Sequence, residues 1–243
     1  IGRQIMEKCA HDIKKVSLEL GGNAPFIVFD DADLDAAVEG ALASKFRNAG
    51  QTCVCANRLY VQDKVYDAFV DKLASAVAAL KIGDGFTEGV TLGPLIDGKA
   101  VAKVREHIED ALAKGAKVVQ GGGAHPQGAN FFEPTILVDV PGTARVAKEE
   151  TFGPLAPVFR FFDDAEVIAK ANDTEFGLAA YFYTANLSRV FRLGEALEYG
   201  IVGVNTGIIS SEAAPFGGVK ASGVGREGSK YGLEDYLEIK YLC

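Results

Sequence analysis

The feature that most constrains the fold of this chain is a regular alternation of short apolar runs with segments of helical periodicity. The runs have strand length, and the run from Phe26 to Phe29 is continuous, as in a buried strand. Where strands and helices alternate along a chain, a mainly parallel, layered sheet is expected. The expected strands are Phe26 to Phe29, Arg58 to Val61, Lys117 to Gln120, Leu155 to Phe162, Ala179 to Tyr183 and Ile201 to Asn205, and the expected helices are Leu34 to Asn48, Val65 to Leu80, Gly98 to Lys114, Ala165 to Ala171 and Leu187 to Glu198. The sequence therefore predicts an α/β fold with a layered, mainly parallel sheet and flanking helices.

Composition excludes several classes of protein. With 243 residues, of which 48% are hydrophobic and 24% charged, the chain is long enough to bury about 70 to 75% of its unfolded surface. No apolar run approaches the roughly 18 residues of a membrane span. A net charge of −8 argues against nucleic acid or an anionic membrane as a partner, and means that an anionic substrate would need a local cation.

Cysteine and histidine usage bounds the chemistry further. Four cysteines without a regular framework suggest free thiols in a reducing compartment, so we expect a cytoplasmic protein. The chain begins at Ile1 with neither an initiator Met nor a signal-peptide pattern, and we expect it to be a fragment of a longer protein. His11, His107 and His125 are scattered, so neither a metal site nor a catalytic triad is expected.

The segment from Phe46 to Cys55 reads as a helix end that runs into a loop with two thiols. The residues just before Cys53 are polar or glycine and include no large apolar side chain, which suits a thiol that reacts with a ligand rather than one that packs in the core. Cys53 is the candidate nucleophile. Cys55 has two readings: a small, semi-buried hydrophobe, or a possible redox partner that closes a short disulfide with Cys53 under oxidation.

A carboxylate in the segment from Val16 to Leu20 is a second candidate. Period-two alternation puts Val16, Leu18 and Leu20 on one face of a strand and leaves Glu19 on the other. The diglycine that follows removes side chains where another backbone or a ligand must come close. Glu19 is therefore a candidate general base, unless it is simply an exposed strand glutamate before a turn.

The segment Gly223 to Gly228 spells G-x-G-x-x-G but lacks the context of a dinucleotide-binding turn. No apolar strand precedes it and no βαβ unit follows it. We interpret it as structural.

Five sequence blocks together resemble the aldehyde dehydrogenase superfamily. Phe46, Gly50, Gln51 and Cys53 fill the family's cysteine signature, Phe-x-x-x-Gly-Gln-x-Cys. The other blocks occur in the family's order as Leu18-Glu19-Leu20-Gly21-Gly22, Glu150-Thr151-Phe152-Gly153-Pro154, Pro215-Phe216-Gly217-Gly218 and Ser222-Gly223-Val224-Gly225-Arg226-Glu227. The chain is most similar to the succinate-semialdehyde dehydrogenase branch, through Phe46-Arg47-Asn48, Gly207-Ile208-Ile209-Ser210-Ser211 and Gly228-Ser229-Lys230-Tyr231-Gly232. The resemblance covers the whole chain but only about the second half of the family's proteins.

The resemblance implies a division of the chain. Residues 1–14 would close a coenzyme-binding domain that is otherwise absent, residues 15–235 would form the catalytic domain, and residues 236–243 would form an oligomerisation strand. This last segment alternates apolar and polar residues, as an edge strand in need of a partner does. In the family the matching strand joins a neighbouring subunit's sheet, so a homo-oligomer, a dimer or a tetramer, is expected.

The resemblance also implies a reaction and a cofactor. Cys53 as a thiolate would attack an aldehyde, a hydride would pass to NAD or NADP, and a water activated by Glu19 would hydrolyse the thioester. The absent domain would bind most of the cofactor. Glu150 would hydrogen-bond the nicotinamide ribose, Phe152 would pack near the nicotinamide, and Leu20 and Gly21 would also lie on the cofactor side. Because one oxyanion donor belongs to the absent half, we expect the chain alone not to oxidise aldehydes.

The substrate implied by the branch is succinate semialdehyde. Arg47 would pair with the distal carboxylate, for which guanidinium geometry is suited, and Ser210 would contact the same carboxylate. A purely structural role for Arg47 stays open, because a cation near a helix C-terminus complements the helix dipole. Glutarate semialdehyde is a close competitor, since one methylene discriminates weakly.

Two further classes of protein stay open from the sequence. One is a cofactor-independent cysteine hydrolase or acyltransferase that uses Cys53 with Glu19, although no histidine is placed as a base near the thiol. The second is a non-catalytic oligomerisation module, which an inert Cys53 would favour.

Overall fold

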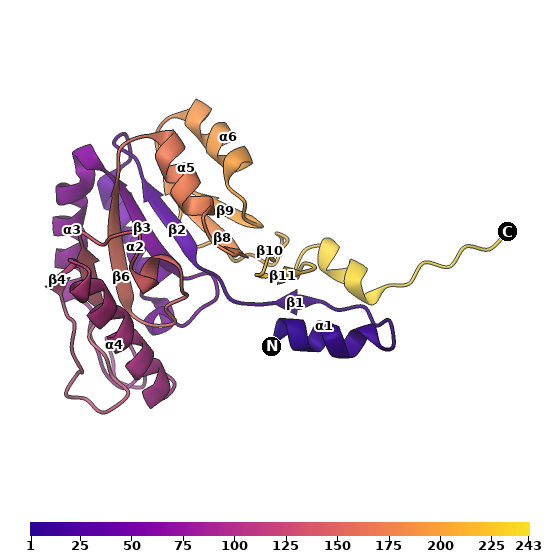
Figure 1. Ribbon diagram of the computed structural model, residues 1–243, viewed down its shortest axis with the longest axis horizontal. Helices are drawn as coiled ribbons and strands as arrows, with labels where there is room; N and C mark the ends of the chain where they lie inside the picture. The colour runs from indigo at the N-terminus through magenta and orange to yellow at the C-terminus, as the bar shows by residue number, and fades with distance from the viewer.

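The computed structural model describes residues 1–243 and is centred on a seven-stranded sheet (Figure 1). The strand order is β4-β5-β6-β3-β2-β8-β9, and only β4 runs antiparallel to its neighbour. In that order the bounds are Lys117–Gln120, Thr135–Val138, Leu155–Phe161, Ala56–Gln62, Ala24–Val28, Ala179–Tyr183 and Ile201–Val204. The predicted α/β fold with a mainly parallel sheet is confirmed.

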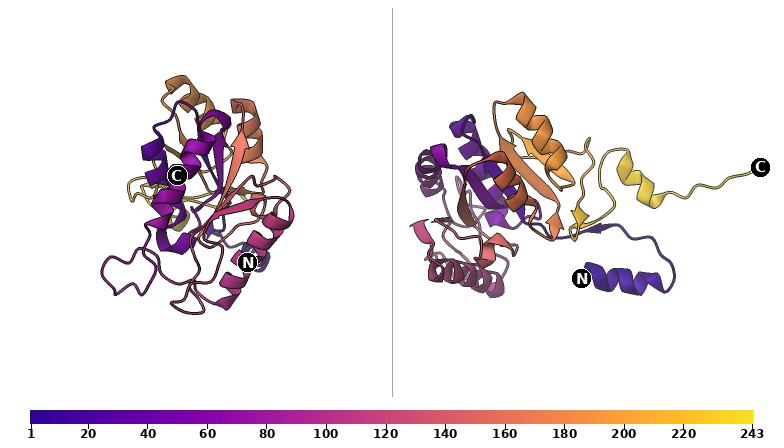
Figure 2. Two further views of the ribbon diagram at one scale, coloured as in Figure 1. Left: turned by 90° about the vertical axis from the view of Figure 1, so that its left-hand side faces the viewer. Right: turned by 45° about the horizontal axis from the view of Figure 1, so that its top comes forward.

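Helices cover both faces of this sheet (Figure 2). Their bounds are Leu34–Lys45 for α2, Tyr66–Ala78 for α3, Gly98–Ala113 for α4, Asp164–Asn172 for α5 and Leu187–Ala196 for α6. The connections β2-α2-β3 and β8-α6-β9 lead in opposite directions across the sheet, so right-handed crossovers put α2 and α6 on opposite faces. Because both faces are covered, every residue of β2 and of β8 is buried.

Four of these helices begin at a polar side chain that caps them. Asp33 accepts hydrogen bonds from two backbone N–H groups of the first turn of α2. Asp97, Asp163 and Asn186 each accept one, at the starts of α4, α5 and α6. Such caps satisfy donors that have no partner inside the helix and each contributes about 1 kcal/mol.

A thinner part of the chain projects from the layered body (Figure 1). It contains helix α1 (Gly2–Ala10) and a two-stranded sheet of β1 (Leu18–Glu19) and β11 (Gly223–Val224). The strand predicted from Val16 to Leu20 is shorter, because only Leu18 and Glu19 find partners in β11. A second short pair joins β7 (Phe176–Gly177) to β10 (Val219–Lys220).

The C-terminal segment extends away from the rest of the chain (Figure 1). After the 3-10 helix Tyr231–Tyr236, residues 237–243 pair with no strand, and Ile239 is 99% exposed. Pairing of residues 236–243 with a neighbouring subunit therefore stays a prediction, as do the domain boundaries after residues 14 and 235.

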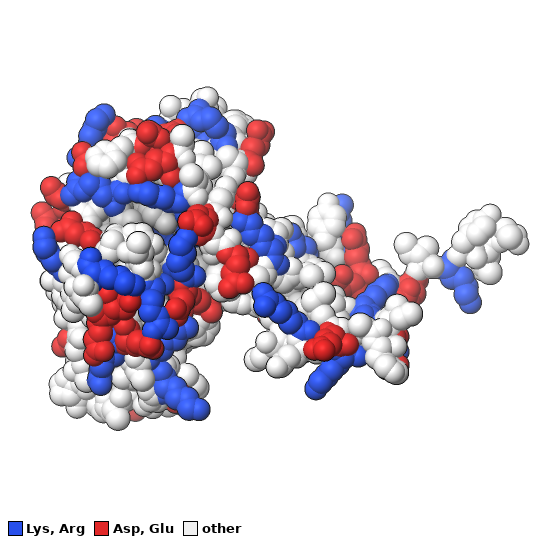
Figure 3. Space-filling model, viewed as in Figure 1, with Lys and Arg blue, Asp and Glu red and all other residues white.

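The surface carries both signs of charge. Figure 3 shows acidic and basic side chains interspersed over the face in view, on the layered body and on the projecting part alike. None of the helices combines the length and the apolar character that crossing a lipid bilayer requires.

Candidate active site

The candidate nucleophile lies on a loop, residues 46–54, that we call the nucleophile loop. Helix α2 stops before the predicted end at Asn48, because Asn48, Ala49 and Gly50 have left-handed φ angles of 52°, 55° and 74°. Gly and Asn adopt such angles readily, whereas a non-glycine residue held there costs on the order of 1–3 kcal/mol. This reversal of the backbone brings Cys53 to the amino end of β3.

Contacts on both sides of the thiol hold this loop. The side-chain amide of Gln51 donates to the Pro94 carbonyl (3.3 Å) and its oxygen accepts from the Ile96 N–H (2.8 Å). The hydroxyl of Tyr181, from β8, donates to the Val54 carbonyl (2.7 Å). The loop is thereby tied to the segment before α4 and to the centre of the sheet.

A buried polar cluster closes the neck of the nucleophile loop. Lys45 Nζ donates to Asn57 Oδ1 (2.9 Å) and lies 3.4 Å from Cys55 Sγ, while that thiol donates to the Lys45 carbonyl (3.4 Å). Burial lowers the pKa of Lys45 and raises the pKa of Cys55. Cys53 and Cys55 are both free thiols. A disulfide between them would pull Cys55 out of these contacts, so the redox latch stays a prediction.

Glycines let several of the sequence blocks meet at this edge of the sheet. A Cβ on Gly22, just before β2, would lie 2.6 Å from the Cys53 carbonyl oxygen. A Cβ on Gly50 would lie 2.5 Å from the carbonyl carbon of Gly153, just before β6. Distances this short exclude any side chain. The amino ends of β2, β3 and β6 therefore converge on the candidate nucleophile.

Glu150 lies at the same convergence. Its Oε1 accepts from the Gly22 N–H (2.8 Å), and its Oε2 would be 2.8 Å from a Cβ on Gly21. No group of the chain donates to Oε2, and burial raises the pKa of this carboxyl group. Glu150, Leu20 and Gly21 line a hollow of about 490 Å³. The free carboxylate oxygen beside a bare glycine fits the predicted contact with a cofactor ribose.

Phe152 lies 40% exposed, two residues beyond Glu150, and does not line that hollow. It lines a neighbouring hollow of about 580 Å³ together with Asn48 and Gln51 of the nucleophile loop. The predicted cofactor residues thus occupy two adjacent surfaces on either side of the turn that carries Glu150.

His107, to which the sequence assigned no role, braces this turn. It is fully buried on α4, with Nδ1 2.7 Å from Thr151 Oγ1 and Nε2 3.2 Å from Glu149 Oε2. Burial lowers the pKa of His107. Arg145 holds Glu149 from the other side through two hydrogen bonds. Helical periodicity, which puts His107 on the buried face of α4, could have indicated the contact.

Two further buried side chains that sequence reasoning missed support the same edge. Ser222 Oγ donates to the Gly21 carbonyl (2.7 Å) and accepts from the Gly177 N–H (2.9 Å). Arg58 donates from Nε to the Asn23 carbonyl (3.0 Å), and from both other nitrogens to carbonyls at the C-terminus of α5. The negative end of that helix accommodates the buried guanidinium. Ser222 begins one of the sequence blocks that resemble the family, whereas Arg58 belongs to none of them.

Glu19 occupies an unusual setting for a carboxyl group. Its Oε2 is buried without a hydrogen-bond partner, and its Oε1 would lie 3.0 Å from a Cβ on Gly217. Burial raises the pKa of Glu19 to about 7, helped by the nearby Glu227 carboxylate and opposed by the Arg226 guanidinium. Near neutral pH this group can therefore both accept and release a proton, as a general base must.

The Cys53 thiol shares this environment. It is half-buried, and burial raises its pKa, with the Glu19 carboxylate acting in the same direction. The backbone N–H groups of Cys53 and Val54 act in the opposite direction, because they stabilise negative charge on the sulfur. The thiol is thus mainly protonated at neutral pH, with a carboxylate nearby that can take up a proton.

Arg47 and Ser210, the predicted substrate contacts, are both exposed. Neither side chain forms a hydrogen bond or ion pair within the chain, so both remain available to a ligand. The Arg47 guanidinium lies close enough to the neck of the nucleophile loop to oppose the rise that burial causes in the pKa of Cys55.

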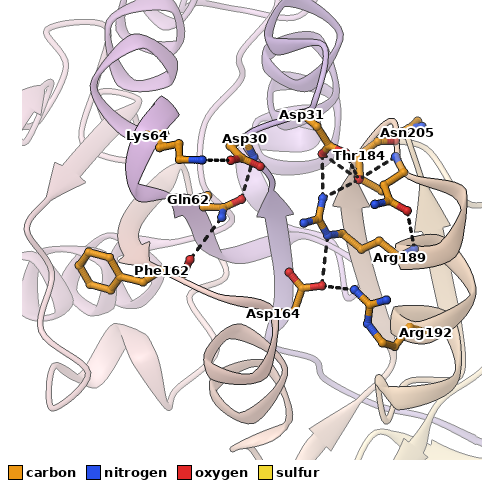
Figure 4. A network of polar contacts seen from close by, with 11 residues as sticks. Asp30, Asp31, Gln62, Lys64, Phe162, Asp164, Thr184, Arg189, Arg192 and Asn205 are labelled. Atoms are coloured by element: carbon orange, nitrogen blue, oxygen red, sulfur yellow. Dashed lines mark hydrogen bonds and ion pairs between the residues drawn. The ribbon is translucent and has the colours of Figure 1, made fainter.

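The opposite edge of the sheet, at the carboxyl ends of the strands, is filled by a polar network (Figure 4). Arg189 reaches from α6 to Asp31 (3.0 Å) and Asp164 (3.2 Å), and stacks over the ring of Phe29 at 4.3 Å. Thr184 donates to Asp31 from the end of β8 (2.8 Å). Ligands of open α/β sheets usually bind at this edge, but here its charges are paired with one another.

Comparison with known proteins gives a consistent result. A sequence profile described as the aldehyde dehydrogenase family matches residues 1–242. The chain is 80% identical, over all of its 243 residues, to the NADP(+)-dependent succinate-semialdehyde dehydrogenase of Escherichia coli strain K12. It is 78% identical over the same length to a glutarate-semialdehyde dehydrogenase of Pseudomonas putida. In both cases it covers 50% of the relative.

A solved structure gives the same picture. The crystal structure of an NADP-dependent enzyme from E. coli matches with a TM-score of 0.98 and 80% identity, over 99% of this chain and 50% of the other. The chain therefore spans about half the length of the curated relatives and of the solved structure that it matches.

Proposed function

The chain belongs to the aldehyde dehydrogenase family, and on that premise we propose that it forms the catalytic half of an NAD(P)-dependent semialdehyde dehydrogenase. The observation that carries the proposal is the shared setting of Cys53 and Glu19. The Glu19 carboxylate raises the pKa of the half-buried Cys53 thiol, which lies where the amino ends of three strands converge, and Glu19 itself has a pKa of about 7. Because the chain spans half of its relatives, the activity belongs to the whole protein.

The chemistry of this chain's own residues begins at Cys53. Its sulfur adds to the aldehyde carbon as a thiolate, and the proton of the thiol passes to a base or to water. The Cys53 N–H supports the oxyanion that develops. NAD(P)+, when bound against Glu150 and Phe152, would supply the hydride acceptor that the change from adduct to thioester requires. Glu19 then takes a proton from the water that attacks the thioester and releases the carboxylate product.

The residues that would hold the cofactor in this half are Leu20, Gly21, Glu150 and Phe152. Glu150 offers an unoccupied acceptor oxygen to a sugar hydroxyl, and Gly21 leaves room for it. NADP is the cofactor in the name of the E. coli relative. We infer that either NAD or NADP serves here, and kinetics with both cofactors would decide between them.

The substrate is a short aldehyde with a distal carboxylate, and succinate semialdehyde is the first choice. Arg47 and Ser210, exposed and unpaired, would bind that carboxylate. A local cation is needed because the chain carries a net charge of −8. Glutarate semialdehyde is the alternative, and the two relatives named for these substrates are almost equally similar to the chain.

A cofactor-independent cysteine hydrolase or acyltransferase is the second candidate, since Cys53 and Glu19 both belong to this half. Turnover of a simple ester by the isolated chain, abolished by Cys53→Ala, would support it. The dehydrogenase proposal makes a different prediction for the same sample. The isolated chain should produce no NADH or NADPH from succinate semialdehyde, whereas a protein extended to the relatives' full length should produce one of them.

Oligomerisation and location complete the proposal. The unpaired apolar residues of the segment 236–243 suit strand pairing with a second copy, so we propose a homodimer or homotetramer. The four free thiols suit a reducing compartment such as the cytoplasm. Sedimentation of the chain with and without residues 236–243 would test the assembly, because a monomer in both cases contradicts it.

A further inference from the structure

The segment after β9 rests directly on helix α2. We call residues 206–211, which include Ser210, the substrate loop. A Cβ on Gly207 would lie 2.6 Å from the Cα of Gly40, and closer still to the carbonyl oxygen of that residue. Backbone therefore touches backbone, with no side chain between. The hydroxyl of Tyr183 also borders Gly40, so this position on α2 is enclosed by the end of β8 as well.

The substrate loop is also linked to the nucleophile loop. Ile209 Cγ2 and Tyr181 Cδ1 both crowd Gly203, at 2.7 and 3.1 Å from the place of a Cβ atom there. Tyr181 in turn donates its hydroxyl proton to the Val54 carbonyl. Ser210 directly follows Ile209, the residue of the substrate loop that meets Tyr181 around Gly203.

The predicted substrate contacts thus lie on two elements that touch each other, and we call these elements the two walls of the site. Helix α2 leads into Arg47 and Cys53, and the substrate loop carries Ser210. We propose that the contact between Gly40 and Gly207 sets the distance between these walls and hence the length of semialdehyde that the site accepts. The inference rests on the proposed function, because it assigns a specificity-determining role at the site proposed for aldehyde oxidation.

A methyl group added at Gly207 should push the substrate loop away from helix α2. To restore an ordinary contact of 3.4 Å, the substrate loop must move away from α2 by about 1 Å, comparable with the ~1.3 Å that one methylene adds to a chain of C–C bonds. Ser210 retreats with the loop while Arg47 and Cys53 stay with α2. The Gly207 backbone has no left-handed φ angle, so alanine is compatible with it.

The experiment measures protection of Cys53 from iodoacetamide in the 243-residue chain. Semialdehydes of four, five and six carbons add reversibly to the thiol, so they protect it without any cofactor. One methylene in a pocket is worth about 10- to 200-fold in discrimination. In Gly207→Ala the ratio of five-carbon to four-carbon protection should rise by about 10-fold or more relative to the parent chain.

Gly194→Ala is the matched control, because a Cβ on Gly194 in α6 meets nothing within 4 Å. It should leave every protection constant unchanged, and butanal and pentanal should protect all variants equally. An unchanged ratio in Gly207→Ala, with the parent chain still protected, would overturn the inference and leave the proposed function standing. Loss of protection by charged and neutral aldehydes alike would also overturn it, because the substitution would then act on the fold. A parent chain that no semialdehyde protects would overturn the inference, and the proposed function would fail only if the full-length protein also formed no NADH or NADPH from these aldehydes.

Discussion

The two edges of the central sheet are built on opposite principles. At the amino ends of the strands, Cys53 lies beside a left-handed backbone reversal and Glu19 keeps a buried oxygen without a partner. At the carboxyl ends, Arg189 joins Asp31 and Asp164 in a paired network (Figure 4). One edge retains a buried polar atom without a partner, and the other satisfies its polar groups within the chain.

This difference teaches where the molecule is stabilised and where it is available for chemistry. Unpaired buried groups and left-handed backbone persist only where the surrounding structure holds them, and they concentrate at functional sites. The paired edge contributes to holding the helices on the sheet. The glycine contacts at the other edge leave polar atoms free for a ligand, since bare backbone occupies little space. Substitutions at the two edges should therefore separate activity from stability.

The largest effect is expected for Glu19→Gln in the full-length enzyme. Loss of a general base typically costs about 10² to 10⁴ in rate. Stopped-flow kinetics should show a first turnover of reduced cofactor and then a stall, because the thioester forms but is not hydrolysed. In the parent enzyme steady-state turnover should fall as the pH drops through about 7, where Glu19 becomes protonated. A variant with full turnover would remove Glu19 from the mechanism.

The same substitution should stabilise the chain above neutral pH. The folded state holds the Glu19 proton up to about pH 7, whereas the unfolded chain releases it near the ordinary value of 4.5. The unfolded state therefore binds fewer protons, and the free energy of unfolding falls as the pH rises from about 4.5 to 7. Urea titrations at pH 5 and pH 8 should show a gain for Glu19→Gln at pH 8 alone; an equal gain at both would contradict the argument.

Arg189→Met tests how much the polar network at the carboxyl ends of the strands contributes to stability. The substitution leaves Asp31 and Asp164 without their shared cation and removes the stack on Phe29. Because the carboxylates keep some contact with water, the free energy of unfolding should fall by about 2 kcal/mol rather than the 3 to 5 of a fully buried pair. Urea titration measures the change. The rate of Cys53 alkylation should stay that of the parent, and a changed rate would mean that the two edges are coupled.

Tyr181→Phe removes one hydrogen bond at the amino ends of the strands and leaves the network at the carboxyl ends unchanged. The Val54 carbonyl loses its donor, and a buried acceptor left unpaired costs about 1 to 3 kcal/mol. Here we expect a loss of about 1 kcal/mol of unfolding free energy, together with a changed rate of Cys53 alkylation as the nucleophile loop loosens. Loss of stability with an unaltered alkylation rate would argue against a positioning role.

Lys64→Met should have the smallest effect. Lys64 is largely exposed, although it pairs with Asp30 at the carboxyl edge (2.8 Å). Exposed pairs contribute little to stability because water and salt screen them, so urea titration should barely separate this variant from the parent. A loss as large as that of Arg189→Met would show that solvent exposure does not distinguish the two pairs.

Local sequence pattern by itself determined most of the secondary structure of this protein. Continuous apolar runs and helical periodicity predicted the strands β2, β3, β6, β8 and β9 and their order with the helices, because burial on both faces leaves such runs. The reactive setting of Cys53 was likewise visible as a short-range pattern.

Only the tertiary structure decided how the site is assembled. The reversal at Ala49 ends α2 early because the packing of Gly50 against Gly153 holds it, and no local propensity predicts that contact. The buried roles of Lys45 and His107, and the approach of Gly207 to Gly40, likewise depend on residues far apart in the chain. Periodicity reports which face of an element is buried, but not which distant residue covers it. The environment that brings Glu19 to a pKa near 7 exists only once that cover is in place.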